Sequence, residues 1–328
     1  MKFGTYPYTT ARMKAMKSLL LARDDYIKMR KMGLNEMIRY LEEREYKKEI
    51  TLLSAEYKRM ELINLALNEN LANTINKLFM ISSKESHVLI KNYSMKWIIN
   101  NIKIIIRSKN WDLVKKAIVP IAPTTHSYCF DLIRKEKNEF VKEVSKVTGI
   151  DEEKFMDLYE NNDIIGMENE LDRLYYSGLV LVHKELGRGV LKDFYKFLIE
   201  LMDIKNVIKL KSIKVQKEVI ESLVTTKSPL VKQIIGESME DSIKTLNESK
   251  YKAFAEGVEK DLSQLENNIE KYLLQYSFKL LHLKPLSIAP IFGYLLAKEI
   301  EIRNLKLLIN SRAVNLDEEF VEKNLITE

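Results

Sequence analysis

The sequence predicts an all-α protein, and three observations support this fold class. Its 328 residues include only 10 glycines and 6 prolines, so long stretches lack the residues that end helices or build tight turns. Several of these stretches follow the 3.6-residue period of an amphipathic helix. Hydrophobic residues make up 46% and charged residues 30% of the chain, which is typical of a folded protein rather than a disordered one.

Two amphipathic helices are the clearest predicted elements, one over residues 171–186 and one over 265–283. Their apolar positions recur at helical spacing: Leu171, Leu174, Tyr175, Leu179, Val182 and Leu186 in the first, and Leu265, Ile269, Leu273, Tyr276, Leu280 and Leu283 in the second. The Gly187-Arg188-Gly189 sequence after the first favours a helix stop. Residues 120–125 and 225–229, which contain prolines and threonines, are predicted to be loops.

The chain also resembles itself at a long period. Residues 101–109, 206–214 and 304–312 each begin with Asn, have apolar residues one and four places later, and end with a base. The first two segments are 105 residues apart and the last two 98. Residues 38–47 match residues 243–252 at an offset of 205, and Phe155 is placed opposite Ile38 in the more diverged middle copy.

These matches divide the chain into three helical units, residues 1–113, 114–215 and 216–328. Units of about 100 residues are far longer than ordinary solenoid repeats, so we expect three similar helical domains in a pseudo-threefold arrangement. Asn101, Asn206 and Asn304 occupy the equivalent place in each unit, which favours a hydrogen bond that builds the fold over a contact with a partner.

Catalytic and ligand-binding motifs are not found. The four histidines, His87, His126, His183 and His282, lack metal-ligand spacing, and the glycine-rich phosphate-binding and nucleophile motifs do not occur. We therefore predict no catalytic residue, no cofactor and no metal, and a chain that does not hydrolyse ATP itself. Cys129, the lone cysteine, is expected to be a small buried side chain in a reducing setting.

The net charge of +6 comes from 53 basic and 47 acidic residues that are mostly interleaved. The strongest basic cluster is Lys205, Lys209, Lys211, Lys214 and Lys217. A solvated helix face is favoured there over a nucleic-acid contact, because Glu218 and Glu221 follow at once.

Apolar stretches are too short for a transmembrane span or a signal peptide. The longest, Leu286 to Ala297, falls well below the about 20 residues that cross a bilayer as a helix. No apolar run of signal-peptide length precedes Asp24. Any membrane role is therefore expected to be peripheral.

Three motifs resemble a known family. Residues 285–305 read PLSIAPIFGYLLAKEIEIRNL and resemble the C-terminal signature of the C subunit of archaeal and bacterial V/A-type ATPases, which is related to the d subunit of the vacuolar ATPase. Residues 6–20, YPYTTARMKAMKSLL, are similar to that family's opening, and residues 170–176, ELDRLYY, to its middle motif. The matches span the chain in the family's order.

The resemblance implies a funnel of three helical domains whose cavity accepts the central stalk and whose narrow side rests on the proteolipid ring. Such a protein is a non-catalytic connector for proton or sodium transport on the cytoplasmic face of the membrane. The matched candidates for structural or partner-contact roles are Pro285, Gly293, Tyr294, Glu299, Arg303 and Asn304. Of these, Gly293 is expected to permit close helix packing, and Glu299 and Arg303 have helical ion-pair spacing. A general helical scaffold, a basic nucleic-acid-binding module and an enzyme stay open as alternatives.

Overall fold

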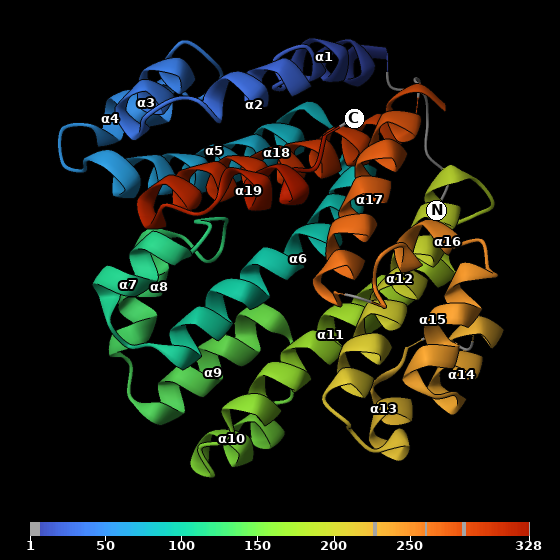
Figure 1. The fold of residues 1–328 in the computed structure, drawn as a ribbon. Coiled ribbons are helices and arrows are strands. Elements are labelled where there is room, and N and C mark those ends of the chain that lie inside the picture. Colours follow the sequence, from blue (N-terminus) through green and yellow to red (C-terminus); the bar gives the residue numbers. More distant parts are fainter. Residues whose placement is uncertain (1–6, 226–227, 260, 284–286, 328) are drawn as a thin grey trace. The chain divides into compact units, whose positions relative to one another are not determined.

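A computed structural model describes residues 7–225, 228–259, 261–283 and 287–327. Within these ranges the chain forms 19 α-helices and no strand, which confirms the predicted all-α class (Figure 1). The helices are α1 (Pro7–Lys17), α2 (Arg23–Met29), α3 (Leu34–Glu42), α4 (Lys47–Leu53), α5 (Arg59–Ile81), α6 (Lys84–Arg107), α7 (Trp111–Ala117), α8 (His126–Arg134), α9 (Lys137–Thr148), α10 (Glu152–Glu160), α11 (Ile164–Glu185), α12 (Val190–Ser212), α13 (Lys217–Leu223), α14 (Pro229–Gly236), α15 (Met239–Asn247), α16 (Lys252–Ala255), α17 (Ser263–Leu283), α18 (Ala289–Val314) and α19 (Glu318–Asn324).

The order of helix lengths repeats three times. Four helices of 4 to 12 residues are followed by two of 21 to 26 residues in α1–α6, α7–α12 and α13–α18, and α19 follows the last series. We call these the first, second and third series. The sequence offset of 205 maps Leu34 and Glu42, the ends of α3, onto Met239 and Asn247, the ends of α15. The internal similarity of the sequence therefore has a counterpart in the order of the helices.

The placement of Phe155 opposite Ile38 is wrong by one helix. Phe155 lies in α10, the fourth helix of the second series, whereas Ile38 lies in α3, the third helix of the first. Phe155 and Leu158 repeat the three-residue spacing of Ile38 and Leu41, but any amphipathic helix offers such a spacing. The offset of 117 between Ile38 and Phe155 also exceeds the 105 between Asn101 and Asn206 by 12 residues, about the length of one short helix.

The described residues form two compact units. The N-terminal unit contains residues 7–175 and 301–325, and the C-terminal unit contains residues 176–300 and 326–327. The three-unit division of the sequence stays a prediction. Its boundary at 113 lies within α7, and its boundary at 215 lies between α12 and α13.

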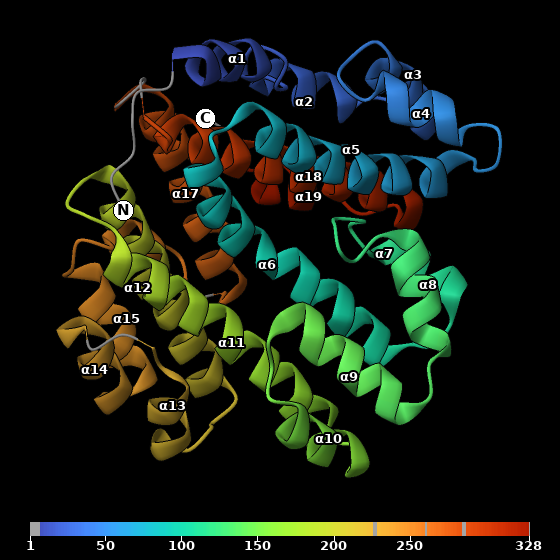
Figure 2. The ribbon, with the colours of Figure 1, turned by 180° about the vertical axis from the view of Figure 1, so that it is seen from behind.

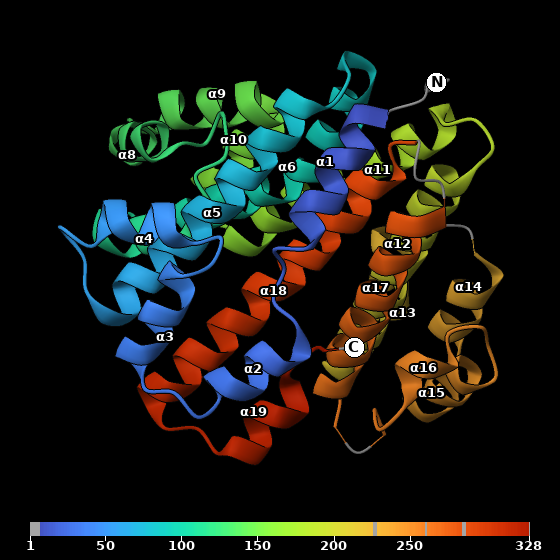
Figure 3. The same ribbon diagram turned by 90° about the horizontal axis from the view of Figure 1, so that it is seen from above.

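The core of the N-terminal unit is built on α5. Its apolar residues at helical spacing, among them Ile63, Leu67, Ile75 and Leu78, are completely buried. Figures 1 and 2 show α5 beside the end of α18, where Lys306 of α18 donates to the Asn68 side-chain oxygen of α5 at 2.7 Å. In the view from above, α1 lies over the end of α5 (Figure 3), where the Thr9 hydroxyl donates to the Ile81 carbonyl at 2.9 Å.

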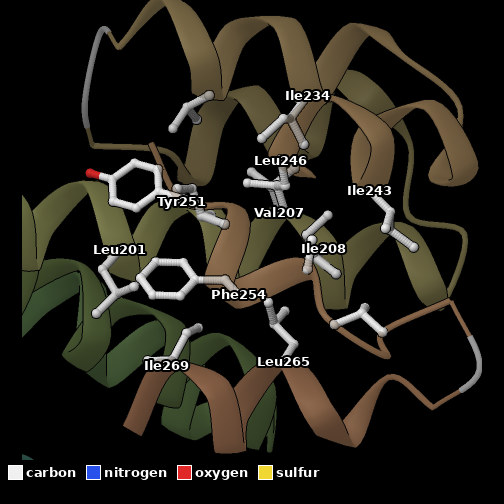
Figure 4. Close-up of a cluster of buried hydrophobic side chains, with 14 of the residues drawn as sticks. Leu201, Val207, Ile208, Ile234, Ile243, Leu246, Tyr251, Phe254, Leu265 and Ile269 are labelled. Carbon is white, nitrogen blue, oxygen red and sulfur yellow. The ribbon is translucent and has the colours of Figure 1, made fainter. Parts of the chain in front are cut away.

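The core of the C-terminal unit brings together helices α12 to α17 (Figure 4). Val207 and Ile208 of α12 meet apolar residues from α14, α15, α16 and α17, and the whole cluster is buried. Each such aliphatic side chain contributes about 1.5–3 kcal/mol relative to an exposed position. The two amphipathic helices of the sequence are α11 and α17, and most of their predicted apolar positions are buried.

The connections follow the sequence with one correction. Residues 120–125 form the irregular segment between α7 and α8, and Gly187-Arg188-Gly189 separates α11 from α12, so both predictions are confirmed. Of the predicted loop 225–229, Thr225 and Ser228 lie between α13 and α14, and residues 226–227 lie outside the described residues. Pro229 is not in the loop, because it is the first residue of α14. Proline is favoured there because the first turn of a helix needs no N–H donor at that position. Among the described residues, no helix has the length and apolar character that crossing a membrane requires.

Candidate functional site

The family-signature residues are divided between the two units. Gly293, Tyr294 and Glu299 belong to the C-terminal unit, and Arg303 and Asn304 belong to the N-terminal unit. Pro285 lies outside the described residues. The signature is therefore not gathered at one site within either unit.

Gly293 lies where α18 approaches α17 closely. A Cβ atom at this position would be 2.5 Å from the Ser277 carbonyl oxygen and 3.0 Å from the Leu281 amide nitrogen. Since real Cβ atoms do not come this close to backbone, only glycine fits without a shift. The close approach of the two helices accounts for the glycine.

Tyr294 is completely buried in the C-terminal unit. Its neighbour Phe292 packs against the rings of Phe194 and Tyr195, with centroids 5.7 and 6.1 Å away. Aromatic pairs at these separations stabilise a core beyond their burial alone. This part of the signature forms the hydrophobic core.

Glu301 is a buried carboxylate on α18 that no sequence pattern had singled out. It is 3% exposed, and its Oε1 accepts a 2.5 Å hydrogen bond from the Tyr46 phenol. Its Oε2 accepts a 2.6 Å bond from the backbone N–H of Leu21, between α1 and α2. Burial, together with the Glu301 charge, raises the pKa of Tyr46 well above its usual value. The phenol therefore stays protonated and remains a donor.

Arg303 and Asn304 bind other parts of the N-terminal unit. Arg303 Nη1 donates to the Asn324 carbonyl at 2.9 Å, at the end of α19. A cation there satisfies a carbonyl that has no partner within its own helix. The Asn304 side chain is fully buried and hydrogen-bonded to the Tyr26 phenol. Both residues fasten short helices to α18.

The C-terminal unit contains a link like that of Glu301 and Tyr46. Tyr251 follows Tyr46 by 205 residues, and each immediately precedes the fourth helix of its series. The Tyr251 phenol donates to Glu200, a 6%-exposed carboxylate on α12 that also accepts from Ser228 at 2.5 Å and Lys250 at 2.9 Å. Burial alone would raise the pKa of Glu200, but these three donors outweigh it and lower the pKa.

A second kind of link joins each sixth helix to the loop between the first two helices of a series. Asn101 on α6 donates to the Val119 carbonyl at 2.6 Å and accepts from the Val119 N–H at 2.9 Å, between α7 and α8. Asp203 on α12 accepts from the Thr225 N–H at 3.1 Å and hydroxyl at 2.8 Å, between α13 and α14. Glu301 on α18 does the same for Leu21, between α1 and α2.

These links follow a cyclic order. The first series holds the loop of the second, the second holds that of the third, and the third holds that of the first. Asn206 lies three residues after Asp203, just as Asn304 lies three after Glu301. The Asn206 amide donates to the Tyr176 hydroxyl at 3.2 Å, so in this series Asp203 is the residue that holds the loop. The asparagine position therefore occurs in all three series, but the side chain that holds the loop is Asn101, Asp203 or Glu301.

The basic cluster does not form one solvated face. Lys205 and Lys209 both bind Glu266, at 2.8 and 2.5 Å, and Lys217 lies 3.8 Å from Glu221. Lys211 donates to the carbonyls of Ile234 and Glu237 and to the Ser242 hydroxyl, at 2.5–2.6 Å. Lys211 therefore caps the end of α14, which corrects the expectation of a solvated side chain.

Two of the histidines make hydrogen-bond contacts within the N-terminal unit, and the cysteine is buried there. His126 Nε2 is 2.8 Å from Glu69, and His87 Nε2 is 2.8 Å from the Phe79 carbonyl oxygen. Over the ranges that the structure covers, no three His, Cys, Asp or Glu side chains are grouped as metal ligands. Cys129 is buried as predicted, and burial raises the pKa of its thiol to about 12.

The fold and these hydrogen-bonded links define an all-α repeat protein, in which buried polar side chains connect three similar series of helices. The family model described as the ATP synthase (C/AC39) subunit matches residues 9–324. The chain belongs to this family. The C subunit of the A-type ATP synthase of Methanococcoides burtonii is 31% identical over 339 residues, covering 98% of this chain and 94% of that one.

Two further relatives have the same name. The A-type ATP synthase C subunit of Methanosarcina acetivorans is 28% identical over 344 residues, which cover 99% of this chain and 94% of the relative. That of Archaeoglobus fulgidus is 28% identical over 333 residues, with 98% and 96% covered. The similarity extends over nearly the whole length of each protein.

Proposed function

We propose that this chain is a non-catalytic connector protein of a rotary V/A-type ATPase or ATP synthase. In this role it joins the central stalk to the proteolipid ring on the cytoplasmic face of the membrane, and so couples ATP synthesis or hydrolysis to proton or sodium transport. The relatives' name, as C subunits of the A-type ATP synthase, supports membership of such a complex. The observation that carries the connector role is the cyclic order of the links made by Asn101, Asp203 and Glu301.

A cyclic order of links favours three series closed around an axis. A body that passes torque needs such an axis and must also resist deformation. Buried hydrogen bonds with fixed partners suit this requirement, because close-packed interiors have low compressibility and transmit strain. The predicted pseudo-threefold funnel is the arrangement that we propose for the three series.

One exposed apolar position recurs after each series and is a candidate contact. Leu113 on α7, Val219 on α13 and Phe320 on α19 each lie on the short helix that follows a long sixth helix, and they are 61%, 45% and 49% exposed. A ring of like subunits presents the same surface repeatedly, so a repeated apolar position fits it. We assign these residues to contact with the proteolipid ring, and we assign Gly293, Tyr294, Glu299, Arg303 and Asn304 to building the fold.

The test is co-purification from membranes. A tagged chain is expected to co-purify with the other components of the ATPase, and the variant Leu113→Asp/Val219→Asp/Phe320→Asp is expected to lose the proteolipid ring. The matched control is Leu181→Asp, since Leu181 is 60% exposed on α11 and outside the recurring position. Circular dichroism checks that both variants are folded.

Three outcomes decide the proposal. Loss of ATP-driven ion pumping in the triple variant, with ATP hydrolysis by the head retained, supports the connector role. A fully coupled complex assembled without this chain would contradict it. ATP hydrolysis by the purified chain alone would contradict the non-catalytic assignment.

A further inference from the structure

A groove in the N-terminal unit brings buried hydrogen-bond acceptors close to basic side chains. It is an open cavity of about 450 Å³ bordered by α1, α4 and α5. The bond from Thr9 to the Ile81 carbonyl holds α1 against the end of α5 and so maintains one wall. Arg12 on this wall belongs to the N-terminal motif, residues 6–20.

The floor of the groove presents hydrogen-bond acceptors. Glu49 is 5% exposed, and its carboxylate accepts from Asn70 Nδ2 at 3.2 Å and from Asn73 Nδ2 at 2.8 Å. Across the described ranges it forms no ion pair. Asn70 is 4% exposed, and no donor within the described residues reaches its Oδ1. A buried carboxylate without a cation and a buried acceptor without a donor are both costly, so this floor is incomplete on its own.

The rim of the groove is mainly basic, although Glu45 also borders the cavity. Arg12, Lys48 and Lys77 border the cavity, and no ion pair holds any of the three within the part of the chain that the structure describes. The floor therefore requires a hydrogen-bond donor with positive charge, while the rim offers cations to acidic groups.

We propose that this groove receives an arginine or lysine side chain from a partner protein, with acidic residues on either side of it. The basic group would reach Glu49 and supply the missing donor to Asn70, while the flanking carboxylates would neutralise the cations of the rim. A guanidinium fits best, since its planar fork of N–H donors can bind a carboxylate and an amide oxygen together. This proposal rests on the proposed function in one respect, because the partner is another component of the same complex.

Photo-crosslinking in the assembled complex tests the partner. p-Benzoylphenylalanine is placed at Asn76, an exposed position that borders the groove, and the control position is Lys142, exposed on α9. Mass spectrometry is expected to find Asn76 crosslinked to a segment of a partner protein that contains Arg or Lys flanked by Asp or Glu. If the chain co-purifies with the complex but Asn76 crosslinks no more than Lys142, or crosslinks a segment without a basic residue, the groove proposal fails and the connector role stands.

Binding of a small probe to the isolated chain supplies a test that does not depend on the complex. Agmatine, a free guanidinium compound, is expected to shift the NMR signals of the Asn70 and Asn73 side-chain amides saturably, with a Kd on the order of 1 mM. The Glu49→Gln variant should weaken this binding by at least about tenfold. Shifts caused by succinate but not by agmatine would overturn the proposal in favour of an acid-binding groove.

The thermal stability of Glu49→Gln separates binding from structure. Gln keeps an acceptor for one asparagine amide and removes a buried charge that lacks a cation, so the isolated variant is expected to melt at or above the temperature of the wild type. A lower melting temperature with unchanged agmatine binding would assign Glu49 a structural role only and would overturn the proposal.

Discussion

The phenol of Tyr46 donates a 2.5 Å hydrogen bond to the carboxylate of Glu301, although the two residues are 255 positions apart in the sequence. The same carboxylate accepts the backbone N–H of Leu21 at 2.6 Å. One side chain of the last long helix thus holds both a loop and a short helix of the first series. Removing one partner of a buried hydrogen bond lowers the free energy of unfolding by a measurable amount, so substitution of Tyr46 can test this link.

Replacement of Tyr46 by phenylalanine should destabilise the N-terminal unit. The variant Tyr46→Phe leaves the buried Glu301 carboxylate short of a donor, and the expected loss in free energy of unfolding is about 1–3 kcal/mol. Tyr251→Phe should have a similar effect in the C-terminal unit. Urea unfolding followed by circular dichroism measures both, with the 64%-exposed Tyr8 changed to Phe as the control. Equal behaviour of Tyr46→Phe and Tyr8→Phe would contradict the assigned link.

The close packing at Gly293 predicts the effect of one added methyl group. Gly293→Ala should gain up to about 1 kcal/mol in helix propensity. Its Cβ would meet the Ser277 backbone oxygen, however, and overpacking of this kind costs about 1–3 kcal/mol. We expect a net lower melting temperature. Gly236→Ala is the matched control, because a Cβ atom there meets nothing within 4 Å. A Gly293→Ala protein at least as stable as the control would show that α17 and α18 can separate without cost.

The cap that Lys211 provides can be distinguished from a general effect of charge. Lys211→Met should lower the free energy of unfolding by about 1.5–3 kcal/mol, because the carbonyls at the end of α14 lose a charged donor. Lys217→Met removes the same charge from an exposed pair with Glu221 and should change stability by less than about 1 kcal/mol. Chemical denaturation of both variants gives the comparison, and similar losses in the two would rule out a specific cap.

The ion cluster around Glu266 predicts a dependence of stability on pH. Burial acts to raise the pKa of Glu266, but the hydrogen bonds from Lys205 and Lys209 outweigh it and lower the pKa to about 2. A carboxyl group with a pKa below its ordinary 4.5 contributes stability that is complete above pH 4.5 and is lost as the pH falls towards 2. The wild type should therefore lose stability more steeply than Glu266→Gln over this interval.

Urea midpoints at pH 6, 4 and 3 check this expectation. Since Glu266 is partly exposed, the difference is expected to be small and to shrink further in high salt. Glu221→Gln, at an exposed pair on α13, serves as the control. Parallel pH profiles for the wild type and Glu266→Gln would contradict the cluster.

Much of the fold could be predicted because helices are encoded locally. The match of residues 38–47 with 243–252 located α3 and α15, whose ends correspond residue for residue. The alignment failed in the middle series, where the apolar spacing of α10 resembles that of α3 and placed Phe155 one helix too late. Tyr46 and Tyr251 both lie in the matched segments, which was a signal for a shared role. Their acceptors gave no such signal, since Glu301 corresponds to Asp203 rather than to Glu200.

The sequence by itself determined the all-α class, because hydrogen bonds between residues four apart and an apolar stripe of period 3.6 depend only on neighbouring residues. It also determined the internal repetition and the family, because both depend on residue identities along the chain. Only the tertiary structure decided which carboxylate meets which phenol, that Lys211 caps α14, and that Glu49 lies buried at the floor of a groove. Those relationships join residues from 21 to 255 positions apart. They form when packed helices exclude water around polar groups, and no local pattern specifies which groups will then be neighbours.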